Sequence, residues 1–551
     1  MSARTLVAAT SAVVLMALAG VCSEAEDVSR PVRPGGVDGQ AFWNGRSVLF
    51  LYPPAFDFKP VEGAVSYRYV VEDDARKEYE FTAERPNLPL APVWTKLPVG
   101  MLRLEVRGLD ARGRYAGLAG YRRFWKSAPF DPAACPPGAC SSGEAATKYF
   151  DWLYGMKNSQ SYLKDGKPDE DYVYNTYPCK TDAAVVRAFV SYAEMRPDRR
   201  EDALAIACRA ADHLLSLTMP AGSPLEHFPH TYRVCTPAHP TSQSDSANRI
   251  SRKYAGQVMT VYPAMVGTAY LALYGAVKDR KYLDAAVRIA ETYAKLQGAD
   301  GTWSLKLWEK DGASVVPNRL FPLAVCGFLE KLYAVTGAAK YRQMSDRAFA
   351  YVEKGPLADW NWEAQFEDVE PSKRYRNLTL HTPVATAIHL LKRYPDDLKR
   401  RALARELLRF AEDQFVLWRP PFRKDGTGPI FGDTPMINCS KASDWYDVPG
   451  AYEQYAWYLP IDSAAAKMIS GYLAFYEVEK QAVDLAKARA LGDAITVMQE
   501  KHGKNGGIPT HWVRWEVGKE TQPWINCGIG TANVLKRLSE VTDTMPVKTK
   551  D

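Results

Sequence analysis

The chain has 551 residues, of which 46% are hydrophobic and 24% are charged, and its formal net charge is +6. Such a chain can bury a large core and is long enough for more than one domain. The modest charge and the lack of a basic run argue against nucleic acid as a partner. A mildly positive balance is compatible with an acidic glycan.

The first 25 residues predict a secretion signal. Arg4 supplies a positive end, residues 6–18 form a short apolar core, and residues 23–25 include the small side chains that signal peptidase prefers. The apolar run is too short for a membrane span, and no other segment is long and apolar enough. We therefore expect a secreted or periplasmic protein. A lipid anchor at Cys22 is the disfavoured alternative, because Val21 is a poor neighbour for a lipidated cysteine.

The nine cysteines form no recognisable metal motif. Neither a CxxC nor an HExxH pattern is present, and these are spacings that supply zinc ligands. We therefore expect no metal site and no cofactor. Cys135 and Cys140, in the stretch ACPPGAC, are placed to form a small-loop disulfide in an oxidising compartment.

Residues 26–130 predict a small all-β sandwich. Short alternating or aromatic-rich segments are separated by Pro and Gly at the spacing of short strands. The segments cover residues 47–58, 66–74, 77–84, 101–113 and 120–127. The stretch resembles a fibronectin type III-like module in the patterns Phe56-Asp57-Phe58, Ala64-Val65-Ser66-Tyr67 and Arg107-Gly108-Leu109-Asp110. Such modules are mostly spacers, so we expect this one to be dispensable for chemistry.

A Pro/Gly/Cys/Ser-rich linker at residues 131–143 leads into a helical domain at 144–541, and a short tail at 542–551 follows. In the domain, apolar residues recur at helical spacing. Twelve helices are predicted, at residues 144–156, 182–193, 200–217, 254–277, 281–296, 321–335, 341–353, 378–393, 398–415, 462–478, 482–499 and 524–538.

The connections between these helices alternate between short and long. Short turns join helices into antiparallel hairpins, and six hairpins joined by long loops place every long loop at the same end. This internal repeat predicts a mainly α fold, an (α/α)6 toroid that follows the β-sandwich module. We expect the second helix of each pair to line the interior, and the long loops to form one cleft.

Several long loops share a Gly-rich turn followed by Trp, as in residues 297–303 and 506–512. This arrangement resembles the six-hairpin glycosidase and toroid polysaccharide-lyase superfamily. A β module ahead of the toroid looks like the layout of some heparinase-type lyases. The resemblance implies an enzyme that acts on a polysaccharide or oligosaccharide. Four loop tryptophans are candidates for stacking on sugar rings, namely Trp303, Trp362, Trp445 and Trp512.

The loop at 360–381 is long, aromatic and rich in ionisable groups, which favours a functional role. Removing a proton next to a uronate carboxylate needs a group that neutralises the carboxylate and a base, and the leaving oxygen needs an acid. The candidate catalytic residues are Tyr254, His230, His381, Asn377 and Arg252. Lys253 and Arg376 are candidates for holding an acidic substrate. We expect Tyr254, next to cations at the start of an inner helix, to exchange protons with substrate together with one of the histidines.

Carboxylates support an alternative chemistry. Glycoside hydrolysis needs an acid and a second carboxylate that flank the bond, and Glu363, Glu367 and Asp368 are the first choices. Asp444, Asp447 and Glu453 come next. The basic loops and the His and Tyr content favour a lyase that cleaves a uronic-acid-containing glycan by β-elimination over a hydrolase. A non-catalytic glycan-binding protein is the third possibility, with too many His and carboxylate residues for that role.

Overall fold

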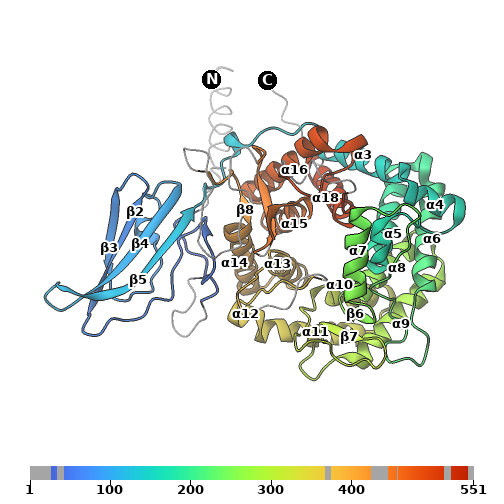
Figure 1. Ribbon diagram of the computed structural model, residues 1–551, viewed down its shortest axis with the longest axis horizontal. Coiled ribbons are helices and arrows are strands. Elements are labelled where there is room, and N and C mark those ends of the chain that lie inside the picture. The colour runs from blue at the N-terminus through green and yellow to red at the C-terminus, as the bar shows by residue number, and fades with distance from the viewer. Residues whose placement is uncertain are drawn as a thin grey trace, which may run out of the picture.

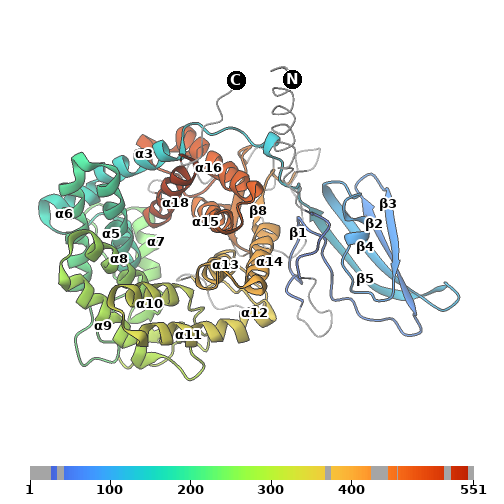
Figure 2. The same ribbon diagram turned by 180° about the vertical axis from the view of Figure 1, so that it is seen from behind.

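The computed structural model describes residues 27–33, 42–366, 374–422, 445–455, 457–513 and 523–543. It shows a β module beside a ring of helices (Figures 1 and 2). The predicted signal segment, Glu367, Asp368 and Asp444 lie outside the described residues. Among the described helices, none combines the length and the apolar character that a bilayer crossing requires.

The β module contains one five-stranded sheet with strand order β1-β5-β4-β2-β3. All neighbouring strands are antiparallel except β1 and β5, which are parallel. A layer of irregular chain and the short helix α2 (Ala91–Trp94) packs its apolar side chains on the sheet. The all-β module is thus confirmed, while the fibronectin type III-like resemblance stays a prediction. The strands are β1 (Leu49–Phe50), β2 (Ser66–Asp73), β3 (Glu78–Ala83), β4 (Gly100–Leu109) and β5 (Tyr115–Lys126).

Twelve helices of the second domain form two concentric rings (Figure 1). The inner ring consists of α5 (Pro178–Met195), α8 (Tyr262–Val277), α10 (Leu323–Thr336), α13 (His381–Arg393), α15 (Asp462–Glu479) and α18 (Ile525–Asp543). The outer ring consists of α6 (Arg200–Ser216), α9 (Arg280–Leu296), α11 (Ala339–Lys354), α14 (Leu398–Phe415), α16 (Ala482–His502) and α3 (Ser142–Gly155).

The inner ring closes on itself, because each inner helix contacts the next and α18 contacts α5. The first outer helix, α3, pairs with the last inner helix, α18, so that the two ends of the domain complete the sixth pair. The predicted (α/α)6 toroid is therefore confirmed. The expected order within each hairpin was wrong, because the first helix after each long loop is the inner one. Inner helices such as α8 are apolar on several sides since they contact neighbours on several sides, whereas α9 is amphipathic.

The described parts of the six long connections lie on one face, as predicted, and contact each other around the ring. The Arg233 N–H donates to the Thr176 carbonyl, and His230 bonds to Glu309. The remaining contacts join Phe321 to Gln365, Leu380 to Glu453, Asp462 to Thr510, and Lys180 to Trp524. We call this end of the toroid the loop face. It contains the N-termini of all six inner helices.

Several local predictions need correction. Helix α8 begins at Tyr262 and not at Tyr254, because strand β6 (Gln257–Met259) precedes it and pairs with β7 (Lys306–Trp308). Helices α4 (Lys157–Asp165), α7 (Ser242–Lys253) and α12 (Pro356–Asp359) lie in long connections and were not predicted. The proposed Cys135–Cys140 disulfide is absent. Both thiols are free, and Cys135 contacts the Asp131 carbonyl.

Candidate active site on the loop face

Several polar side chains of the loop face stand at or near the starts of the inner helices. Each long connection ends where an inner helix begins, so it delivers its last side chains to the rim of the central opening. The positive ends of the helix dipoles point to the same rim. This position favours negatively charged or strongly polar ligands.

His381 and Glu453 form the pair at the centre of this arrangement. His381 is the first residue of α13, and its Nε2 lies 3.1 Å from Glu453 Oε1. Glu453 belongs to strand β9 (Gly450–Gln454), just before α15. The Glu453 backbone carbonyl accepts hydrogen bonds from the Thr379 hydroxyl and the Leu380 N–H. These bonds hold the two segments of the chain side by side. His381 retains 27% of its side-chain exposure, so it can reach a ligand.

A second histidine lies on the α18 side of Glu453. His511 is buried, and burial lowers its pKa to about 4, an effect that the Glu453 charge opposes. Its imidazole is therefore neutral at physiological pH. The ring meets the edge of Trp524 at 5.3 Å, and the Lys180 ammonium lies 5.9 Å over the Trp524 ring. The two histidines thus differ, since His381 is partly exposed and bonded to Glu453, whereas His511 is buried.

Glu363 and Asn377 lie on the adjacent chain segments. The Asn377 side-chain amide donates to Gln454 Oε1 at 2.8 Å, and Glu363 pairs through its backbone with Leu378. Burial raises the pKa of Glu363 to about 8, against the opposing effects of the Asn377 backbone amide and the Arg376 charge. Neither carboxylate oxygen has a well-aligned hydrogen bond from the described residues. Glu363 is therefore a carboxylic acid at neutral pH.

Tyr254 and His230 occupy the α8 side of the loop face. Tyr254 is 5% exposed and contacts the Tyr232 ring, with Lys306 4.1 Å and Lys253 5.0 Å from its centroid. His230 Nδ1 lies 2.8 Å from Glu309 Oε1, and this bond raises the pKa of the histidine. In the ring, α10 lies between α8 and α13. The structure therefore places these residues in a different sector from His381 and Asn377.

Three of the four predicted stacking tryptophans are core residues. Trp303, Trp362 and Trp512 are each exposed by 1% or less. The Trp303 indole N–H donates to the Tyr293 carbonyl, which ties the side chain into the core. These three rings have no exposed face for a sugar, which corrects the sequence-based expectation.

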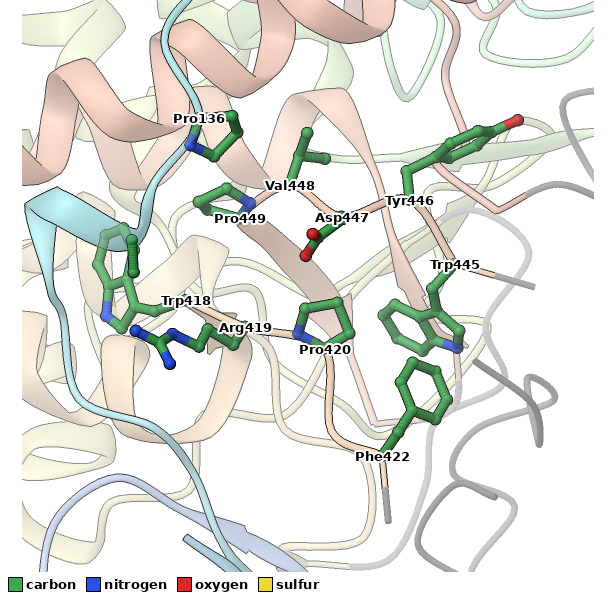
Figure 3. A pocket seen from close by; sticks show the side chains of 11 residues that line it. Pro136, Trp418, Arg419, Pro420, Phe422, Trp445, Tyr446, Asp447, Val448 and Pro449 are labelled. Atoms are coloured by element: carbon green, nitrogen blue, oxygen red, sulfur yellow. The ribbon is translucent and has the colours of Figure 1, made fainter. Parts of the chain in front are cut away.

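The fourth tryptophan, Trp445, borders a cavity of about 610 Å³. Figure 3 shows its ring beside Phe422, with Arg419 and Asp447 on other walls of the same cavity. The ring itself is 5% exposed and meets Phe422 at 5.7 Å. This cavity adjoins the linker at Pro136 and does not include His381 or Glu453.

The remaining predicted residues are solvent-facing. Arg252, Lys253 and Arg376 are exposed, and Arg252 and Lys253 end helix α7. Glu367 lies outside the described residues. In the part of the chain that the structure describes, no group of three or more His, Cys, Asp or Glu side chains is arranged to hold a metal ion.

Sequence reasoning missed His511, Trp524 and Lys180 as members of the rim. His511 is directly followed by Trp512, and the glycine-rich turn ahead of them drew attention to the tryptophan. The useful signal for Lys180 and Trp524 was position, since both lie within two residues of an inner-helix start, whereas His511 lies well before the start of α18. Glu453 was only a second choice among the carboxylates.

No family model matches the chain, and no curated protein matches it either. Among solved structures, a family 76 glycoside hydrolase from a bovine Bacteroides thetaiotaomicron strain is 11% identical, with coverage of 88% of this chain and 95% of that one and a TM-score of 0.44. Unsaturated glucuronyl hydrolase from Streptococcus agalactiae is 16% identical (75% and 94% covered, TM-score 0.46). A D-mannose isomerase is 12% identical (72% and 95%, TM-score 0.48). Likenesses this distant carry no conclusion about the reaction.

Proposed function

We propose that the protein is a carbohydrate-active enzyme that cleaves a uronic-acid-containing glycan by β-elimination at the loop face. The His381–Glu453 pair carries this proposal. A histidine held by a carboxylate is a group suited to proton transfer near neutral pH. It stands at the mouth of a ring that six helix N-termini surround, where an acidic substrate is favoured.

The geometry of the pair assigns the role of each ring nitrogen. An ionised carboxylate only accepts hydrogen bonds, so His381 Nε2 carries the hydrogen that faces Glu453. Nδ1 then keeps its lone pair and is the basic nitrogen. Glu453 stabilises the imidazolium that forms after proton transfer, which is a positioning and electrostatic role.

In the elimination, His381 takes the proton from the carbon next to the uronate carboxylate. The electron pair of this C–H bond forms a carbon–carbon double bond, and the bond to the glycosidic oxygen breaks. Tyr254, the acid expected from the sequence, lies in a different sector of the ring from His381, so we propose that the His381 imidazolium gives its proton to the departing oxygen. Asn377 and Lys180 are the rim groups proposed to neutralise the substrate carboxylate.

The test is digestion of a panel of uronate-rich polysaccharides, monitored by the ultraviolet absorbance of an unsaturated uronate. His381→Gln should lower turnover by about a hundredfold or more, in the range that general acid–base groups supply. His239→Gln is the matched control, because His239 is exposed on a loop. Reducing ends without an unsaturated product would overturn β-elimination, and full activity of His381→Gln would overturn the assigned base.

One observation favours hydrolysis as a second candidate. Glu363, with its pKa raised to about 8 by burial, is a carboxylic acid of the kind that protonates a glycosidic oxygen in hydrolases. If the protein is a hydrolase, Glu363→Gln should abolish activity while His381→Gln retains most of it. The product would then lack the unsaturated chromophore.

We also propose that the enzyme is exported, on the strength of the signal-like first 25 residues. An exported location gives access to extracellular glycans. Detection of the mature protein in the periplasm or the medium, with a new N-terminus near residue 25, tests this part of the proposal.

A further inference from the structure

Four cationic side chains project from four different inner helices below the loop face. They are Arg187 on α5, Lys331 on α10, Lys392 on α13 and Lys467 on α15. At a rise of 1.5 Å per residue, these positions lie about 7 to 17 Å from the N-terminal ends of their helices. Lys467 is the nearest to the rim and Lys392 the farthest.

Helix α10 shows that this side of the inner ring faces open space. Ala324, Gly327 and Lys331 follow each other at helical spacing and share one face. Ala324 and Lys331 are exposed, and a side chain added at Gly327 would meet nothing within 4 Å. Since α8, α11 and α13 contact the other faces of α10, the open face points to the toroid axis.

Two other inner helices give the same result. A side chain added at Gly275 of α8 or Gly530 of α18 would also meet nothing within 4 Å, and both glycines are exposed. None of these three positions of the inner ring therefore carries a bulky side chain. Among the cations, Lys331 and Lys392 are exposed, and Arg187 and Lys467 are partly exposed.

The four charges are close enough to affect each other. Lys331 keeps contact with solvent, but desolvation by the surrounding protein, and then the charges of Arg187 and Lys392, lower its pKa. Burial, and then Lys392, lowers the pKa of Lys467 to about 8. Helices α5 and α10 are not neighbours, because α8 lies between them. Arg187 and Lys331 therefore approach each other across the interior.

Within the described residues, none of these four cations forms an ion pair, although paired cations are common elsewhere in the toroid. Arg187 donates only to the Ala183 carbonyl of its own helix. Like charges that gather without counter-charges destabilise a fold. Such an arrangement is typical of a site that binds an anion.

We infer that these residues form an axial subsite for an acidic group, a carboxylate or sulfate ester, of a glycan that enters from the loop face. The subsite rests on the proposed function, since it holds the same glycan farther along the axis than His381. An acidic group next to Lys467 would lie about 7 Å below the rim, measured along the helix. The enzyme would then select chains that carry a second negative charge at this distance.

The experiment compares a uronate tetrasaccharide with its neutral methyl ester by calorimetric titration. Lys467→Met should weaken binding of the acid by about tenfold or more, as expected for the loss of one charged hydrogen bond, and leave binding of the ester unchanged. Lys467→Arg should restore affinity for the acid. Lys399→Met, on the exposed start of outer helix α14, is the matched control.

Thermal unfolding separates a ligand-binding role from a structural one. Lys467→Met should raise the melting temperature, because it removes an unpaired charge from a cationic cluster. A lower melting temperature together with equal losses for acid and ester would overturn the subsite. Unchanged binding of the acid by Lys467→Met would also overturn it and leave the proposed function intact. Failure of the wild type to bind either saccharide would overturn both proposals.

Discussion

Buried carboxylates occur in two regions of the molecule, and the two regions differ in the hydrogen bonds that they offer to these groups. At the joint between the β module and the toroid, Asp413 accepts hydrogen bonds from the Leu51 and Tyr52 backbone N–H groups. Its neighbour Glu412 accepts from the Trp418 indole and contacts the Lys487 ammonium at 2.8 Å. On the loop face, neither Glu363 carboxylate oxygen has a well-aligned hydrogen bond among the described residues, although the Asn377 backbone amide lies close enough to oppose the rise of its pKa.

The difference separates structural from functional carboxylates. Buried polar groups in a native fold are normally satisfied, so a fully bonded set such as Glu412 and Asp413 stabilises the joint. An unsatisfied buried acid costs stability, and it persists where the protein uses it. The joint also explains why the β module is more than a flexible spacer, since its edge residues Val48, Leu49 and Leu51 belong to the toroid core.

The largest effect is expected at the joint. Glu412→Ala removes the buried carboxylate that contacts the Lys487 ammonium, which is 3% exposed. The free energy of unfolding should fall by about 3 to 5 kcal/mol, as measured by denaturant titration. The double variant Glu412→Leu/Lys487→Met should recover much of the loss. If Glu412→Ala is as stable as the wild type, the joint is not held by this pair.

The next effect is on turnover. Glu453→Gln removes the charge that stabilises a protonated His381, so turnover should fall by about a hundredfold with the melting temperature unchanged. Glu309→Gln is the matched control, because Glu309 contacts His230 in the same way at the periphery of the loop face. Equal losses in the two variants would erase the distinction between the central pair and the peripheral one.

A smaller effect tests the cost of burying the Glu363 carboxyl group. Its pKa rises from 4.5 to about 8 on folding. Between these values the unfolded chain has released a proton that the folded chain retains, so wild-type stability falls as the pH rises through this range. Glu363→Gln lacks this pH dependence. The stability of the variant relative to the wild type should therefore increase between pH 5 and pH 8, by on the order of 2 kcal/mol. Parallel stability curves from pH 5 to pH 8 would show that Glu363 is an ordinary carboxylate.

The comparison also shows what the sequence could reveal. The toroid was predictable because the alternation of short and long connections is a property of the chain order, and local periodicity suffices to find each helix. His381 and Asn377 were predictable because they stand just before or at a helix start in an unusually polar loop. Both features are local.

The rest depended on contacts between distant segments. Whether Trp303 packs in the core or faces the cleft is decided by Tyr293 and by the depth of the loop. The pairing of His381 with Glu453 joins residues from two different long connections. The start of α8 was misplaced because β6 pairs with β7, a partner that lies farther along the chain. No local pattern reports such pairings.

The smallest expected effect concerns the aromatic residues that replace the predicted stacking platforms. Trp524 is partly exposed at the rim, between His511 and Lys180, whereas Trp303 is buried. Trp524→Phe should raise KM by about threefold to tenfold, as expected for the loss of roughly 1 kcal/mol of aromatic contact, with little change in melting temperature. Trp303→Phe should lower the melting temperature and leave KM nearly unchanged. The reason is that it leaves a cavity and a Tyr293 carbonyl without its indole donor in the core. Both variants replace Trp with Phe and so remove the same atoms. The size of the side chain therefore cannot explain opposite outcomes. If Trp303→Phe raises KM and Trp524→Phe only lowers stability, the glycan binds through the interior side of the loops and the rim assignment fails.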